Sequence, residues 1–232
     1  MRPPLRMSLM GKAGTGKSHV LDALLWYAFQ HDMTDRVVVL SYTWRAALHI
    51  STPTNMGCST STFFGINLGD GLAQSKRAID HLCERLHPSV RLILIDENSF
   101  NNCRHFFSMS RACELASSTW PGPSPPLNEA AGFGRVSIVC TGDFKQHPPI
   151  SAEPLYNSLL ATTARASASA TAQEAQRGRL IWREFKDVFF LTTQYRFEDS
   201  ADGRKLADML EELTSENLTR KQASSPQICM DQ

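Results

Sequence analysis

The run Gly11-Lys12-Ala13-Gly14-Thr15-Gly16-Lys17-Ser18 decides the fold expected for this chain. It fits the pattern of Gly, any four residues, Gly, Lys and then Ser or Thr, which forms a phosphate-binding loop between a strand and a helix. Glycines let the backbone wrap closely around phosphates, and the helix that starts there adds the positive end of its dipole. The residues expected to bind the phosphates are Gly11, Ala13, Gly14, Thr15, Gly16, Lys17 and Ser18.

The segments on either side of the loop support this interpretation. Residues 5–10 are typical of a short strand, and residues 18–29 are typical of a mostly buried helix. In such a loop the Lys17 ammonium reaches the β- and γ-phosphates of the nucleotide, and the Ser18 hydroxyl binds Mg²⁺. The alternative, a Gly-rich turn before a surface helix, leaves this strand–loop–helix order unexplained.

Further apolar runs indicate the rest of the sheet. We expect strands over residues 36–40, 91–95, 136–140 and 188–191. Because these runs are apolar throughout, they predict strands that are covered on both faces, as in a parallel sheet between helices. The expected fold class is therefore α/β: a P-loop NTPase with a single RecA-like domain.

Local composition suggests how the domain is organised. We expect one ATP-binding domain over residues 1–214 and a polar tail over 215–232. Residues 117–134 are rich in Pro, Gly and Ser and predict a loop. Residues 161–176 are a low-complexity Ala/Ser/Thr/Gln segment, which is either a mobile insertion or a weak helix; we favour the mobile insertion.

Bulk composition excludes some classes of protein. Among 232 residues the hydrophobic fraction is 42% and the net charge is +1, so any nucleic-acid surface must be a local groove. No apolar stretch reaches the roughly 20 residues of a membrane span, and we see no signal peptide. The six cysteines show no paired metal-ligand spacing, and we interpret them as reduced thiols of an intracellular protein.

Two adjacent carboxylates follow the apolar run over residues 92–95. In a P-loop enzyme the first, Asp96, holds Mg²⁺, and the second, Glu97, polarises the attacking water. Buried strands often end in acidic residues, so the pair is a weak signal alone. Downstream of an intact phosphate-binding loop it becomes a strong one.

Two further polar groups follow expected strands. Gln146, in the run over residues 141–149, lies where a glutamine can sense the γ-phosphate or orient water. Arg196 follows the strand over 188–191 and can act as an arginine finger, but a solvated Arg196 that pairs with Glu198 or Asp199 is equally compatible with the sequence.

Two segments after the second expected strand are candidates for contact with nucleic acid. The hydroxyls and backbone N–H groups of residues 43–47 and 59–66 can contact a nucleic-acid backbone. Phe63 or Phe64 can stack on a base, but we prefer the interpretation that both belong to the core.

In this order, the motifs resemble those of the PIF-type (petite integration frequency) DNA helicases of superfamily one, including relatives carried by Helitron transposons. The resemblance covers most of residues 5–214. Its most specific part is the phosphate-binding loop combined with the later Gly-Asp-Phe-Lys-Gln-x-Pro-Pro run. The other matching positions are Thr43, Ala46, Ala47, Phe63 to Ile66, Ile95 to Glu97, Ser99, Phe133, Gly134, Trp182, Leu191, Tyr195 and Arg196.

The resemblance implies an ATP-driven translocase that moves 5′ to 3′ on single-stranded DNA, with ATP and Mg²⁺ clamped between two RecA-like domains. It implies that Gln146 and Arg196 couple the γ-phosphate to DNA. It also implies functions in DNA repair, recombination and telomere maintenance, and a nuclear or mitochondrial location. The family pattern has Gly where Trp44 stands, His where Ser61 stands and Leu where His147 stands.

By the family pattern the upstream adenine-reading Gln motif and the second RecA-like domain are missing from this chain. Single-stranded DNA is therefore expected to be a weak partner. Two alternatives stay open: an ATP-binding module that unwinds nothing, and a decayed transposon-derived remnant without helicase activity. A small-molecule kinase is a third, which the run over residues 142–149 argues against.

Overall fold

The fold is that of a computed structural model, which describes residues 3–67, 71–72, 76–122, 132–146, 148–149, 152–156 and 169–195. Side chains are described over the same ranges except at positions 67, 71, 72 and 76. Arg196 and the expected polar tail lie outside the described residues. So do part of the expected loop, over 123–131, and part of the expected insertion, over 161–168.

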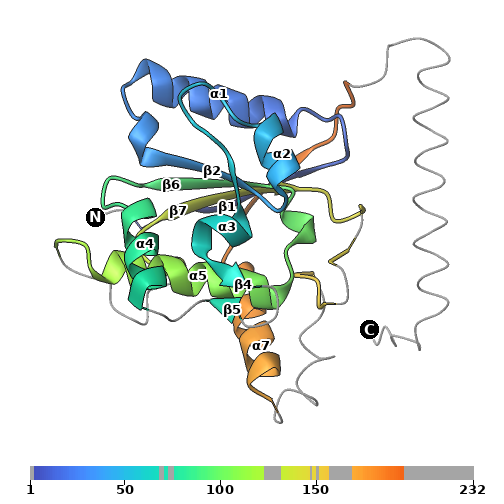
Figure 1. The fold of residues 1–232 in the computed structure, drawn as a ribbon. Coiled ribbons are helices and arrows are strands. Elements are labelled where there is room, and N and C mark those ends of the chain that lie inside the picture. Colours follow the sequence, from blue (N-terminus) through green and yellow to red (C-terminus); the bar gives the residue numbers. More distant parts are fainter. Residues whose placement is uncertain are drawn as a thin grey trace, which may run out of the picture.

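A six-stranded parallel sheet forms the centre of the molecule (Figure 1), which confirms the expected α/β fold class. The strand order is β3-β2-β6-β7-β1-β8. The strand bounds are β1 Arg6–Gly11, β2 Val37–Ser41, β3 Cys58–Ser59, β6 Leu92–Asp96, β7 Ser137–Gly142 and β8 Asp187–Leu191. A small antiparallel pair, β4 Ile66–Asn67 and β5 Gly71–Leu72, lies apart from it.

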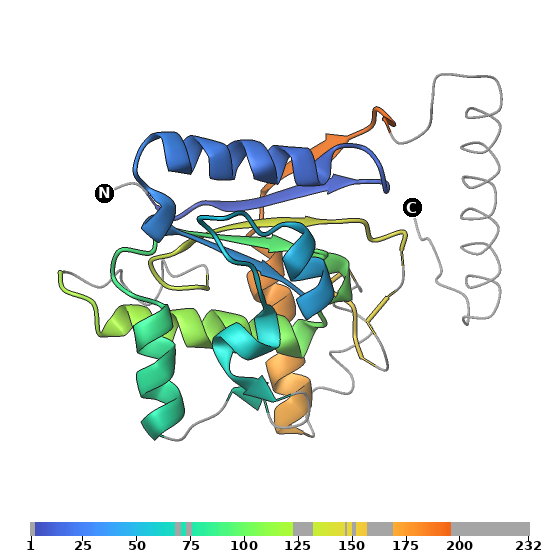
Figure 2. The same ribbon diagram turned by 45° about the horizontal axis from the view of Figure 1, so that its top comes forward.

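Helices cover the two faces of the sheet unequally (Figures 1 and 2). The α-helices are α1 Lys17–Gln30, α2 Trp44–His49, α3 Thr60–Phe64, α4 Lys76–Arg85, α5 Cys103–Ser118 and α7 Ala170–Arg183. Two short 3₁₀ helices are η1 Thr34–Arg36 and η2 Asn98–Phe100. Helix α1 lies on one face, and α3, α4, α5 and α7 lie on the other.

The main core lies between the sheet and α5. Residues such as Ile93, Ile138 and Phe106 are fully buried there. The core on the α1 side is smaller and consists of Leu21, Leu25, Val39, Ile50, Leu94 and Val139. In the described part of the chain no helix is long and apolar enough to cross a membrane, and no three His, Cys, Asp or Glu side chains gather in a metal-binding group.

The expectation of a mostly buried helix after the phosphate-binding loop is wrong in part. Helix α1 buries the stripe Leu21, Leu25 and Ala28, but Trp26 is 65% exposed and Phe29 is also exposed. The physical reason is that α1 lies on the outside of the molecule and contacts the sheet along one stripe only (Figure 1).

The expectation that every apolar strand is covered on both faces fails at β8. Its residues Val188, Phe189 and Phe190 are exposed. Strand β8 pairs only with β1 and forms an edge of the sheet, so it has a neighbouring strand on one side. A run of apolar residues does not indicate whether the strand lies at the centre or at the edge of the sheet.

The expectation of a mobile insertion over residues 161–176 is also corrected where the structure describes it. Residues 170–176 form the first half of α7, which Ser169 caps by accepting a hydrogen bond from Ala172 N. Helix α7 packs on α5 so closely that a Cβ at Gly178 would lie 1.8 Å from the Cys103 carbonyl oxygen. Tertiary packing therefore stabilises a helix that the sequence suggests only weakly.

Candidate nucleotide-binding site

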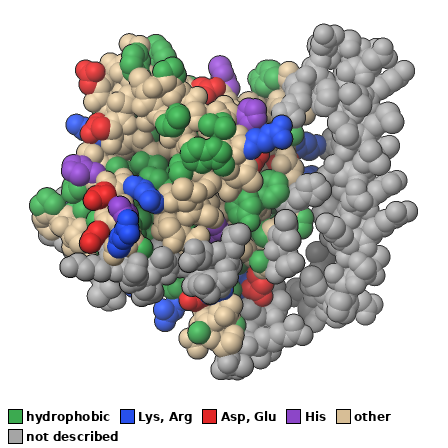
Figure 3. Space-filling model, in the orientation of Figure 1, with side chains coloured by type: hydrophobic (Ala, Val, Ile, Leu, Met, Phe, Trp, Pro, Cys, Tyr) green, Lys and Arg blue, Asp and Glu red, His purple; other side chains and the backbone are tan. Residues whose placement is uncertain are grey.

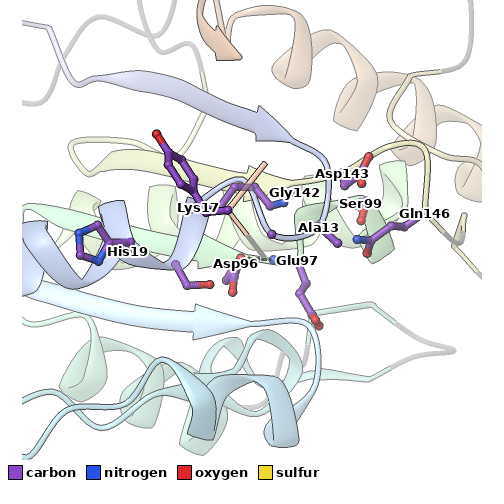
Figure 4. A pocket seen from close by; sticks show the side chains of 13 residues that line it. Ala13, Lys17, His19, Asp96, Glu97, Ser99, Gly142, Asp143 and Gln146 are labelled. Atoms are coloured by element: carbon purple, nitrogen blue, oxygen red, sulfur yellow. Dashed lines mark hydrogen bonds between the residues drawn. The ribbon is translucent and has the colours of Figure 1, made fainter. Parts of the chain in front are cut away.

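The predicted loop and both polar motifs meet at the carboxyl edge of the sheet. Strands β1, β7 and β6 are neighbours and end at Gly11, Gly142 and Asp96. A pocket of about 400 Å³ opens there (Figure 4), within the range of small-molecule sites. It is lined by Ala13, Gly14, Gly16, Lys17, Ser18, His19, Asp96, Glu97, Ser99, Gly142, Asp143, Gln146 and Tyr195.

The loop has a backbone shape that suits phosphate. Gly14 and Gly16 have φ angles of 83° and 90°, in the left-handed region that glycine tolerates best. Gly16 is also the N-cap of α1, and no side chain caps this helix end. The first N–H groups of α1 are therefore available to an anion, and the helix dipole favours negative charge there.

Two predicted loop residues support the pocket without lining it. A Cβ at Gly11 would lie 2.4 Å from the Thr15 hydroxyl oxygen and 2.9 Å from the Leu191 carbonyl, so the chain packs there with no room for a side chain. Thr15 is buried, and its hydroxyl donates to the Lys12 carbonyl at 2.9 Å. Both residues therefore shape the loop from behind.

The Lys17 ammonium lies folded against the loop. Its Nζ donates to the carbonyl oxygens of Gly11, at 2.6 Å, and Lys12, at 2.8 Å. This geometry keeps one positive charge at the pocket, where it can turn toward a phosphate in exchange for these neutral acceptors. A phosphate oxygen carries negative charge, so it attracts the ammonium more strongly than a neutral carbonyl does, which favours that exchange.

Asp96 and Ser18 offer oxygen ligands that fit Mg²⁺. Oδ1 of Asp96 accepts hydrogen bonds from the Thr141 hydroxyl and from Glu97 N, which fixes the carboxylate. Oδ2 takes part in neither bond. The Ser18 hydroxyl belongs to the same pocket, and a hard cation prefers such oxygens. Bound there, Mg²⁺ would supply positive charge that offsets the negative charge of the phosphates.

Glu97 combines a strained backbone with a perturbed side chain. Its φ of 54° and ψ of 37° place a non-glycine residue in the left-handed region, just before η2 begins. Burial and then the neighbouring Asp96 raise the pKa of the Glu97 carboxyl above its ordinary value, while His49 lowers it. A raised pKa is the property expected of a general base that works near neutral pH.

Gln146 reaches the pocket from the turn that follows β7. Figure 4 shows Asp96 and Glu97 below the loop, with Lys17 and His19 on one side and Asp143 and Gln146 on the other. The turn bonds within itself, since Gln146 N donates to the Asp143 carbonyl at 3.1 Å. The structure thus brings Gln146 together with the predicted metal and base residues.

The segment after β8 closes the pocket from the other side, which the sequence did not reveal. Gln194 Nε2 donates to the Ala13 carbonyl at 2.8 Å, and Tyr195 N donates to the Gly14 carbonyl at 2.9 Å. The Tyr195 ring is exposed at the pocket, where it can cover a nucleobase. The sequence signals were the position of residues 192–195 after a strand and the match of Tyr195 to the family pattern, and neither predicts these bonds.

The candidate nucleic-acid segments have structural functions as well. Thr43 caps α2 and Ser59 caps α3, each accepting a backbone N–H bond. Phe63 and Phe64 are buried in the main core, which confirms the preferred interpretation for both. The Trp44 side chain on α2 is half exposed. Figure 3 shows that hydrophobic side chains lie beside basic ones on the face of the molecule that it draws.

A parallel sheet whose carboxyl edge carries this loop, an acidic pair and a polar turn defines a P-loop NTPase domain of the RecA-like class. The sequence pattern of the PIF1-like helicase family matches residues 4–221. The chain therefore belongs to the PIF1-like helicase family. Comparison with curated proteins gives no match.

Solved structures of Pif1 helicases share the fold. The chain is 21% identical to the Candida albicans Pif1 helicase, with a TM-score of 0.62 over 98% of this chain and 46% of that one. It is 17% identical to the Bacteroides Pif1 helicase in complex with ADP-AlF3 and ssDNA, with a TM-score of 0.55 over 100% of this chain and 49% of that one. The chain thus spans about half the length of these structures.

Proposed function

We propose that this chain is the ATP-binding part of a DNA helicase motor that moves 5′ to 3′ on single-stranded DNA. The observation that carries the proposal is the pocket in which Lys17, Asp96, Glu97 and Gln146 converge. Those four groups supply what phosphoryl transfer to water needs: in that order, a positive charge beside the phosphates, a metal ligand, a general base and a contact with the γ-phosphate.

The proposed chemistry divides among these side chains. Lys17 and the N–H groups at the start of α1 hold the phosphates. Asp96 and Ser18 would hold Mg²⁺. Glu97, with its raised pKa, takes a proton from the attacking water as that water bonds to the γ-phosphorus and the β–γ bond breaks. Gln146 senses whether the γ-phosphate is present.

Nucleotide and DNA as ligands are supported by relatives. Bacteroides Pif1 structures are described in complex with ADP-AlF4 and bound to ssDNA. In this chain α2 and α3 follow β2 and β3 at the same edge of the sheet as the pocket. A single strand of DNA that crosses these two helices therefore lies beside Glu97. Thr43, Trp44 and Arg45 are exposed there and can contact a phosphate or a base.

The experiment compares ATP hydrolysis by the parent chain and by Glu97→Gln, with and without single-stranded DNA. The substitution keeps the size of the side chain but removes the base, so we expect the rate to fall at least 100-fold while ATP affinity stays the same. Glu184→Gln, at an exposed position, is the matched control and keeps the parent rate.

Equal rates for the parent and Glu97→Gln would rule out Glu97 as the base. Binding of ATP with no hydrolysis in the parent, with or without DNA, would instead favour the alternative of an ATP-binding module.

A further inference from the structure

The turn that carries Gln146 is held from behind by two aromatic rings. The Phe144 ring lies 5.6 Å from that of Trp182 on α7, at an interplanar angle of 87°. It lies 5.3 Å from the Tyr156 ring, at 61°. Such edge-to-face pairs contribute about 0.5–1.5 kcal/mol each beyond the area that they bury. Phe144 therefore fixes the turn two residues before Gln146.

Tyr156 belongs to residues 152–156, which other contacts anchor to the domain. Leu155 is buried in the main core. The Glu153 carbonyl accepts a hydrogen bond from Cys103 N at 3.0 Å, and its carboxylate pairs with Arg179 at 2.7 Å. The Arg179 side chain is only 1% exposed, whereas that of Glu153 is 43% exposed, so a buried guanidinium pairs with a carboxylate that reaches the surface.

The same segment also contacts the start of α5. Pro154 pairs with Asn102, and the Pro154 carbonyl accepts a weak bond from the Cys103 thiol. Asn102 and Cys103 start α5, which follows Glu97 through η2. Residues 152–156 thus join the support of Gln146 to the start of the helix behind Glu97.

We propose that residues 152–156 and α7 form a brace that positions Gln146 for the γ-phosphate, with Tyr156 and Trp182 as its positioning residues. The inference rests on the proposed function, because it assigns γ-phosphate sensing to Gln146. The Gln146 side chain is exposed and its turn bonds within itself. Its direction toward the pocket therefore depends on how Phe144 is packed.

The experiment measures calorimetric affinities of the full chain for Mg·ADP and for Mg·β,γ-imido-ATP. Their ratio reports γ-phosphate sensing and removes effects on the rest of the site. In Tyr156→Ala we expect this preference for the triphosphate to fall about tenfold, the value of one hydrogen bond to a charged group, with ADP affinity unchanged. Tyr156→Phe keeps the ring and keeps the preference. Tyr27→Ala, an exposed aromatic on α1, is the matched control.

A double-mutant cycle separates positioning from a merely structural effect. Gln146→Ala alone should lower the preference by the same factor, and adding Tyr156→Ala should lower it no further. An unchanged preference in Tyr156→Ala, or losses that multiply in the double variant, would overturn the inference. Equal affinity of the parent for both nucleotides would overturn it too, while the proposed ATP site would stand. A parent that binds neither nucleotide would overturn the proposed function itself.

Discussion

At the scale of single residues, Gly142 explains how Glu97 keeps its unusual backbone. A Cβ at Gly142 would lie 3.2 Å from Ser99 N and 3.4 Å from Asn98 N, so β7 packs directly against η2. This contact holds the chain immediately after Glu97, and a left-handed non-glycine residue costs roughly 1–2 kcal/mol without such support. The close packing of β7 against η2 therefore supports the strained backbone at Glu97.

Gly142→Ala tests that support. The added methyl must push η2 away by a few tenths of an ångström, which displaces Glu97 more than it disturbs the core. We expect the ATP hydrolysis rate to fall about tenfold or more, with a loss of about 1 kcal/mol in the free energy of unfolding. A variant that hydrolyses ATP at the parent rate would show that η2 does not position Glu97.

His105 makes the stability of the domain depend on pH. Burial lowers the pKa of its imidazole from 6.5 to about 4, and Nε2 has no hydrogen-bond partner. The unfolded chain therefore binds a proton that the folded chain does not between pH 6.5 and 4. The contribution of neutral, buried His105 to the free energy of unfolding is therefore fully present above pH 6.5, and it is lost as the pH falls toward 4.

From pH 7 to pH 5 we expect His105 to remove about 2 kcal/mol from the free energy of unfolding. The measurement is urea denaturation at both pH values, for the parent and for His105→Gln. The variant lacks the titrating ring, so its free energy of unfolding should fall less between pH 7 and pH 5 than that of the parent, by the contribution of His105. The same pH dependence in both proteins would contradict the account of His105.

At the scale of elements, the contact between α5 and α7 is the tightest described. A Cβ at Gly178 would meet the Cys103 carbonyl oxygen at 1.8 Å and its carbonyl carbon at 2.7 Å, and backbone atoms cannot move aside as a side chain can. We expect Gly178→Ala to lower the free energy of unfolding by about 1–3 kcal/mol, measured by chemical denaturation.

Gln173→Ala is the matched control, because Gln173 is exposed on the same helix, and alanine favours helix there. If Gly178→Ala proved as stable as Gln173→Ala, the two helices would not be packed as closely as the structure shows.

Strand β8 exposes an apolar edge, with Phe189 at 56% and Phe190 at 71% exposure. Edge strands with unpaired N–H and C=O groups and apolar side chains promote association between chains. We expect the parent chain to self-associate as its concentration rises and Phe190→Lys to do so less, with an unchanged melting temperature. Light scattering is the measurement, and equal association of the two proteins would contradict the prediction.

The elements show which parts of the fold can be predicted from sequence. Apolar runs located β2, β6 and β7 within one or two residues, because burial on both faces selects such runs. The order of strands in the sheet is a long-range property, so the exposed edge at β8 was missed. The start of helix α7 was only the less favoured of two predictions, because an Ala/Ser/Thr/Gln run is a weak helix signal; its contact with α5 through Gly178 supplies the stability.

The same distinction applies to the site. The spacing of Lys17, Asp96 and Gln146 along the chain was enough to predict that they share one sheet edge, because parallel strands end together. Tyr195 lies at the pocket because the segment after β8 bonds to the phosphate-binding loop, through the Gln194 side chain and the Tyr195 backbone N–H. No local sequence pattern predicts those bonds. The function of Arg196 stays a prediction.

At the scale of the whole molecule, the described residues form one RecA-like domain, and the chain spans 46% of the Candida albicans Pif1 helicase. Unwinding needs grip on a strand that alternates between two domains as they close and reopen. We therefore expect these 232 residues alone not to unwind a duplex with a 5′ tail. ATP-dependent strand displacement that Lys17→Ala abolishes would contradict this prediction.

Binding of Mg·ATP by the loop over residues 11–18 is the central claim, and calorimetric titration tests it most directly. Lys17→Ala removes the point charge that faces the phosphates, so we expect it to weaken ATP binding about 10- to 100-fold. Lys186→Ala, at a lysine whose side chain is 75% exposed, should bind ATP as the parent does. Equal ATP affinity in the parent and Lys17→Ala would contradict the assignment of the site.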